Sequence, residues 1–219
     1  MTGRGPLVHR SVHTGAIFYI VAAAQFILAM IVVGLRYPGY SISGNPISDL
    51  GGPNSPLPYI FNASAILFGI LAFLGTVLIR SAFPPRPSRG LGLLLFLIGS
   101  IAVVLVGVFP EGSSQLGGNI HGYVASTAFL AGGLALPILA LAMRRDTRWG
   151  GYRLYTAISG LVSLIATGLY ASGTYLSLGP GGTERLIVAP ILLWGIVAGI
   201  HLARLPTYAP PKSVVASPA

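Results

Sequence analysis

Residues 14–35, TGAIFYIVAAAQFILAMIVVGL, form an apolar run that contains no charged residue and a single amide side chain, that of Gln25. A helix needs about 20 apolar residues to cross a hydrocarbon core of roughly 30 Å. This run is long enough to do so, and it is too long for the apolar region of a secretory signal peptide. We therefore expect it to be an uncleaved first transmembrane helix.

Five further apolar runs follow, and none of them carries a charge in its middle. Together the six runs lie at residues 14–35, 57–79, 91–109, 120–143, 154–177 and 184–203. Backbone amides and carbonyls in lipid must be satisfied within the segment, which a helix achieves. The sequence therefore predicts an all-α integral membrane bundle of six transmembrane helices over residues 1–205. We expect the proline-rich segment 206–219 to be a disordered cytoplasmic tail.

The composition of the chain excludes several classes of protein. Its 219 residues are 53% hydrophobic and 8% charged, with a mean hydropathy of +0.79, whereas roughly a quarter of the residues in soluble domains are charged. The net charge of +9 comes from short basic clusters between apolar runs. Nucleic-acid binding needs a basic stripe instead, so we expect no nucleic-acid partner. The absence of cysteine excludes disulfides, thiolate catalysis and Cys-ligated zinc.

The basic residues indicate how the bundle is oriented. Of 13 basic residues, only Arg36 and Arg185 fall on the side away from the termini. Positive charge accumulates in cytoplasmic loops, so we expect both termini in the cytoplasm and the protein in the cell membrane. The remaining basic residues, all on the predicted cytoplasmic side, are Arg4, Arg10, Arg80, Arg86, Arg89, Arg144, Arg145, Arg148, Arg153, Arg204 and Lys212.

The predicted outer loop at residues 36–56 is unusual in length and composition. It is rich in glycine and proline and cannot form one helix. Connectors in compact bundles are usually shorter. We therefore expect a packed functional element, such as a lid or a re-entrant segment.

Within this loop, residues 45–52, NPISDLGG, place a hydroxyl beside a carboxylate at Ser48 and Asp49. The pair could take part in chemistry. Both side chains could equally bond to backbone amides within a turn. The sequence leaves these two interpretations open.

Two other outer segments carry candidate residues. Glu111 follows the third run by two residues, and His121 lies one turn into the fourth, where an imidazole needs a partner. A structural hydrogen bond and a role as ligand or base are both open for His121. Before the sixth run, a glycine-rich turn precedes Thr183, which we expect to be its N-cap. Glu184 would then lie in the first turn, where the helix dipole favours a carboxylate.

Topology brings Asp49, Glu111, His121, Glu184 and Arg185 to one membrane boundary, where polar groups usually face the protein interior and pair. The four potential ligands among them could hold a divalent metal ion that activates water. Arg185 could then bind an anionic group of the substrate, or pair with a carboxylate.

An alternative chemistry uses Ser48 as the nucleophile and His121 as its base. The strand–turn–helix context of a nucleophile elbow is missing around Ser48. The distance between the two side chains cannot be inferred from the sequence.

Three outer segments together resemble the six-helix prokaryotic membrane family catalogued as domain of unknown function 998 (DUF998). They are residues 45–52 followed by Phe61-Asn62, then Phe109-Pro110 with His121-Gly122, and finally Glu184-Arg185 leading to Pro190, Leu193 and Trp194. In that family a histidine commonly precedes the proline of the first motif, where this chain has Asn45. The resemblance implies the fold and topology and brings no established activity.

These observations leave three classes of function. We expect a structural or accessory subunit of a membrane complex, whose partners are the bilayer and other subunits or further copies of the chain. The first alternative is an enzyme that acts on a lipid-linked or amphipathic substrate at the outer face, by metal-assisted hydrolysis. A small transporter comes last, because polar residues near the middle of the spans are few; they are Ser100, Ser163 and Thr167.

Overall fold

The structure is a computed structural model that describes residues 5–112 and 119–204. Each of the six apolar runs forms a helix that is long and apolar enough to cross a membrane. The described part of the chain contains no strand, which confirms the predicted fold class. Segment 206–219 lies outside the described residues. The long helices are α1 (Gly5–Arg36), α2 (Pro58–Ile79), α3 (Pro87–Val108), α4 (Ile120–Ala142), α5 (Tyr152–Ala171) and α6 (Gly179–Arg204).

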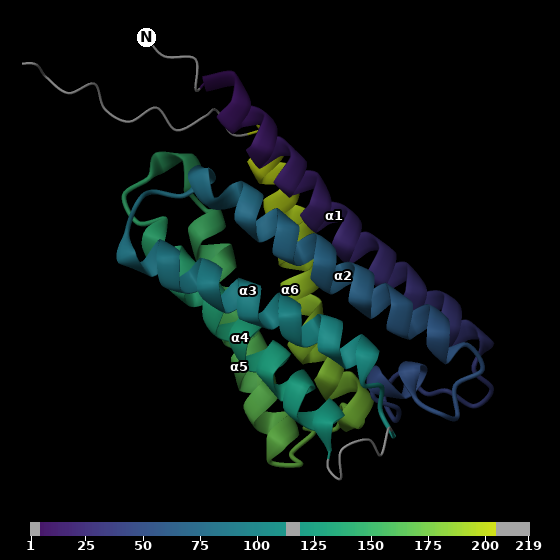
Figure 1. Cartoon of the computed structure of the whole chain (residues 1–219). Coiled ribbons are helices and arrows are strands. Elements are labelled where there is room, and N and C mark those ends of the chain that lie inside the picture. The colour runs from purple at the N-terminus through teal and green to yellow at the C-terminus, as the bar shows by residue number, and fades with distance from the viewer. Residues whose placement is uncertain (1–4, 113–118, 205–219) are drawn as a thin grey trace, which may run out of the picture.

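The helices form a closed ring in chain order. Each helix packs against the next, and α6 returns to pack against α1 (Figure 1). The side chains that point out of the ring include many large apolar groups, among them Leu28, Leu154 and Ile165, each at least 60% exposed. A soluble protein would bury such groups, so this outer surface suits contact with lipid acyl chains.

The two ends of the bundle differ in charge. The end that carries the α1–α2 loop holds Asp49, Glu111 and Glu184, and we name it the acidic end. The opposite end, which we name the basic end, holds the α2–α3 and α4–α5 connections and the last residues of α6. Figure 1 shows the start of α1 and the end of α6 together at this end. The assignment of the basic end to the cytoplasm remains a prediction from charge.

The last two helices differ from the prediction in their bounds. α5 ends at Ala171 instead of residue 177, because a turn with positive φ at Gly173, Leu176 and Ser177 follows it. α6 begins at Gly179, so the prediction of Thr183 as N-cap was wrong. Thr183 lies inside the helix, and its hydroxyl donates to the Gly179 carbonyl one turn earlier (2.9 Å).

Small residues allow neighbouring helices to approach closely. A Cβ added to Gly69 of α2 would lie 2.6 Å from the Ser100 carbonyl oxygen of α3. At Gly160 of α5, an added Cβ would lie 2.4 Å from Pro137 Cδ of α4. Close backbone packing of this kind stabilises helix pairs in membranes, where hydrophobic burial contributes little.

Candidate functional site

The α1–α2 loop, residues 37–57, is fastened to the start of α6. The Ser43 carbonyl accepts hydrogen bonds from the backbone amides of Gly181 (2.8 Å) and Gly182 (3.2 Å). The first turn of a helix leaves such amides without partners, so the loop caps α6. A Cβ at Gly181 would lie 2.1 Å from the Asn45 carbonyl oxygen. The glycine-rich segment that we interpreted as a turn is thus the surface on which the loop docks.

Arg185 holds the same loop from the second turn of α6. Its Nη1 donates to the carbonyls of Ile42 (2.8 Å), Asn45 (3.0 Å) and Gly181 (2.9 Å). The guanidinium forms no ion pair with any carboxylate of the acidic end among the described residues. In this structure Arg185 therefore positions the loop; its predicted role in substrate binding remains a hypothesis.

Tyr40 links Arg185 to the next part of the loop. Its hydroxyl accepts from Arg185 Nη2 (2.6 Å) and donates to the Pro46 carbonyl (3.0 Å). Burial raises the pKa of Tyr40 above its ordinary value of 10.0. The hydroxyl consequently keeps its proton and can donate to Pro46 over the physiological pH range.

Glu184 caps the short 3-10 helix η1 (Ser48–Gly51). Its side chain is 6% exposed, and its carboxylate accepts hydrogen bonds from the backbone amides of Ile47 and Ser48. A carboxylate is favoured where a helix begins, because the first amides are free and carry partial positive charge. We predicted this role for Glu184 at the start of its own helix, but α6 begins earlier and Glu184 serves η1 instead.

Asp49 contributes to the internal structure of the loop. Its Oδ2 accepts from the Asn45 side-chain amide (2.8 Å), and Asn45 Oδ1 accepts from the Ser41 backbone amide (2.9 Å). Asn62 of α2 ties the end of η1 to the bundle by donating to the Gly51 carbonyl (3.0 Å). The hydrogen-bond partner of Asp49 is thus a side-chain amide within the loop and not the backbone amide that the turn interpretation named.

His121 and Glu111 lie on the other side of the acidic end. His121 Nδ1 is 2.9 Å from the Phe109 carbonyl oxygen and must donate to it, because a carbonyl only accepts. This leaves Nε2 without a partner among the described residues. At the same end of the bundle, Glu111 Oε2 is buried and has no hydrogen-bond partner among the described residues. Glu111 is also close enough to Glu184 for a direct electrostatic interaction.

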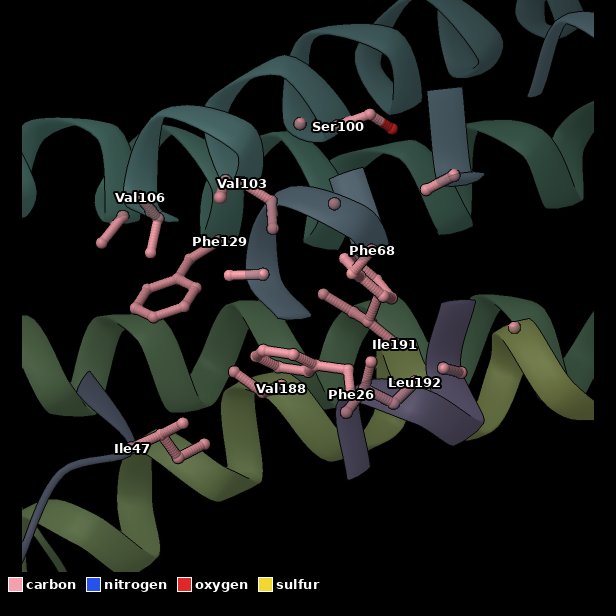
Figure 2. A pocket seen from close by; sticks show the side chains of 18 of the residues that line it. Phe26, Ile47, Phe68, Ser100, Val103, Val106, Phe129, Val188, Ile191 and Leu192 are labelled. Atoms are coloured by element: carbon pink, nitrogen blue, oxygen red, sulfur yellow. The ribbon is translucent and has the colours of Figure 1, made fainter. Parts of the chain in front are cut away.

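A cavity of about 120 Å³ runs from the acidic end into the bundle. Ser48, His121 and Glu184 lie in its wall, so the structure brings three of the candidate residues to one space. Deeper in the bundle the wall is formed by aromatic and aliphatic side chains of α1, α2, α3, α4 and α6. Figure 2 shows Phe26, Phe68, Phe129, Val188 and Ile191 gathered around this interior space.

The candidate residues do not form a metal-ligand cluster. Within residues 5–112 and 119–204, no three His, Asp or Glu side chains lie close enough to hold one metal ion. Asp49 and Glu184 instead direct their carboxylates to amide groups of the loop. The metal-assisted alternative therefore gains no support from the positions of Asp49, Glu111, His121 and Glu184.

Sequence reasoning missed two participants at the acidic end. Asn45 connects Asp49 to the loop, and Tyr170 of α5 interacts electrostatically with Glu184, Glu111 and Asp49. Tyr170 looked like an ordinary aromatic residue near the end of a span. The structure places it at the same end of the bundle as these three carboxylates.

A sequence model of the family described as protein of unknown function (DUF998) matches residues 20–201. No curated protein and no solved structure matches the chain. The family match reaches all six helices and includes every candidate residue of the acidic end. The chain therefore belongs to the DUF998 family.

Proposed function

We propose that this protein is an accessory membrane protein that holds the apolar chain of an amphipathic ligand inside its helix bundle. The ligand's polar end would lie at the acidic end, beside Ser48, His121 and Glu184. The observation that carries this proposal is the distribution of polar groups along the cavity: these three lie together at one end, and most of the remaining wall is apolar. Ligand sites are commonly apolar with a few convergent polar groups.

The dimensions of the cavity favour a single narrow chain. Along α6 its wall extends from Glu184 to Gly195. At a rise of about 1.5 Å per residue this is about 16 Å, or roughly half of the hydrocarbon core. An apolar cavity of roughly 150 Å³ accepts a group the size of benzene, so one of about 120 Å³ suits one alkyl or isoprenoid segment.

A second groove supports access from the membrane. It measures about 500 Å³, lies between α1 and α6, and is bordered by exposed apolar side chains such as Leu35 and Leu193. Ile47, Val188 and Leu192 line both this groove and the inner cavity. A chain could therefore pass from lipid into the bundle where these three side chains move apart.

The proposal is tested by lipid extraction and mass spectrometry of the protein purified in mild detergent. Ala125 of α4 lines the cavity, and Ala125→Phe would fill it. Ala63 of α2 is exposed and lines none of the cavities described above, so Ala63→Phe is a matched control. We expect a stoichiometric amphipathic molecule with the wild type and the control and its loss from Ala125→Phe. Equal recovery from all three proteins, or none from the wild type, would contradict the proposal.

One observation favours a second candidate, hydrolysis of an ester within such a ligand. The Ser48 hydroxyl has no hydrogen-bond partner among the described residues, and both it and His121 line the cavity. Ser48 would attack the carbonyl carbon while His121 Nε2 takes its proton and passes it to the leaving alkoxide. Water would then release the acid from Ser48.

The two candidates differ in what Ser48→Ala does. If the protein only binds, Ser48→Ala retains the same ligand as the wild type. If it hydrolyses an ester, Ser48→Ala and His121→Ala accumulate an intact ester that the wild type lacks, and mass spectrometry separates these outcomes.

A further inference from the structure

A groove at the basic end combines an apolar wall with two arginines. It measures about 430 Å³ and is lined by Arg144 and Arg153 together with Pro137, Ala140, Leu141, Leu154 and Ala157 of α4 and α5. Leu141 is 51% exposed and Leu154 is 61% exposed, so both sides of the groove face the membrane. The groove is separate from the cavity at the acidic end, with which it shares no residue.

The positive charge at this groove is not paired with a negative charge within residues 5–112 and 119–204. The side chains of Arg144 and Arg153 are exposed and have no hydrogen-bond or ion-pair partner among the described residues. The chain has four acidic residues, and Asp146 alone lies at the basic end. Its carboxylate is bound by Arg148 (2.7 Å). No side-chain carboxylate in the described part of the chain is therefore left to neutralise Arg144 and Arg153.

Both arginines lie where the apolar spans of α4 and α5 meet the α4–α5 connection, which is where lipid headgroups are expected. Arg144 follows α4 by two residues, and Arg153 is the second residue of α5. Exposed leucines precede Arg144 and follow Arg153 in the membrane-facing surface. A molecule that satisfies the whole groove must carry a negative group at its end and a long apolar chain beside it.

We propose that this groove binds an anionic phospholipid of the surrounding bilayer, with its phosphate at Arg144 and Arg153 and an acyl chain between α4 and α5. Arginine binds phosphate oxygens in a bidentate manner, and basic pockets between transmembrane helices are suited to anionic headgroups. Along α4, Pro137 is the lining residue farthest from Arg144, and it packs closely against Gly160 of α5. The site is independent of the ligand proposed for the inner cavity.

The test is native mass spectrometry of the full-length protein titrated with phosphatidylglycerol or with phosphatidylcholine of the same acyl chains. We expect selective binding of phosphatidylglycerol, and binding about 30-fold weaker in Arg144→Gln/Arg153→Gln, from the attraction of an anionic lipid to each arginine. The control Arg10→Gln/Arg80→Gln removes two exposed charges from the same end outside the groove. It should bind like the wild type.

A second variant distinguishes binding of the lipid in the groove from attraction by the two positive charges alone. Ala157→Phe fills the apolar part and leaves both arginines in place. We expect it to lose phosphatidylglycerol binding while its melting temperature without lipid stays close to that of the wild type. Binding that survives Ala157→Phe, or that falls equally in the two double variants, would overturn the proposal. Competition by soluble glycerol 3-phosphate at equal concentration would also overturn it, because the acyl chain would then contribute nothing.

Discussion

Replacement of Arg185 by alanine should release the α1–α2 loop from the start of α6. Three of its hydrogen bonds join α6 to the loop, at the carbonyls of Ile42 and Asn45 and at the Tyr40 hydroxyl. A hydrogen bond to a charged group contributes about 1.5–3 kcal/mol, and we take the lower value because the Ile42 contact is exposed. Together the three bonds give about 4.5 kcal/mol. At about 1.4 kcal/mol per tenfold change, the open fraction of the loop should rise by about 1,000-fold.

The assay is limited proteolysis of the loop in detergent under native conditions. When opening and closing are faster than cleavage, the cleavage rate follows the population of the open form. The control is Arg36→Ala, which removes an exposed positive charge from the same end with no hydrogen bond to the loop. Arg185→Lys keeps the positive charge but lacks the planar guanidinium with its several N–H donors, so the cleavage rate of this variant should be intermediate. Equal cleavage of Arg185→Ala and Arg36→Ala would refute the reasoning.

Three further predictions concern the loops at the two ends. Gly181→Ala places a Cβ 2.1 Å from the Asn45 carbonyl, so it should cost about 1–3 kcal/mol and speed proteolysis of the α1–α2 loop. Hydrogen bonds from Arg148 lower the pKa of Asp146 below 3.8, so their stabilisation is present above that value and lost as the pH falls through the lowered pKa. Hydrogen exchange in the α4–α5 loop should rise over that range in the wild type and show no such step in Asp146→Asn. Since the pKa of Tyr40 is raised above 10.0, the loop's stability should fall as the pH rises beyond 10.0, and Tyr40→Phe should lack this fall in proteolysis assays.

The spans could be predicted because membrane insertion depends on a sum over about 20 residues. The first four helices lie where the apolar runs indicated, although α1 begins earlier, at Gly5. The start of α6 was missed because Gly179 to Gly182 have the composition of a turn. Proline is nevertheless compatible with the first turn of a helix, and Pro180 occupies that position. The Ser43 carbonyl supplies the partner that this weak helix start requires.

The acidic end was partly predictable for a different reason. Topology alone brought Ser48, His121 and Glu184 to one boundary, and they do share a cavity. Their partners could not be predicted, because most are backbone groups far away in the chain. The Ile47 amide bound by Glu184 is 137 residues distant, and backbone amides carry no sequence signal. Arg185 likewise binds carbonyls, which every residue possesses.

The closure of the ring in chain order has a consequence for biosynthesis. α1 leaves the ribosome first, yet one of its two neighbours in the ring is α6, which is translated last. Until then the α1–α2 loop lacks Arg185 and the amides of Gly181, and the amides at the start of η1 lack Glu184. The inner cavity is open on its α6 side over the same period. A nascent chain stalled after α5 would therefore expose an α1–α2 loop without its α6 contacts, and a cavity without its α6 wall, to the lipid and the insertion machinery. The tertiary structure of the acidic end is therefore complete only after α6 has been inserted.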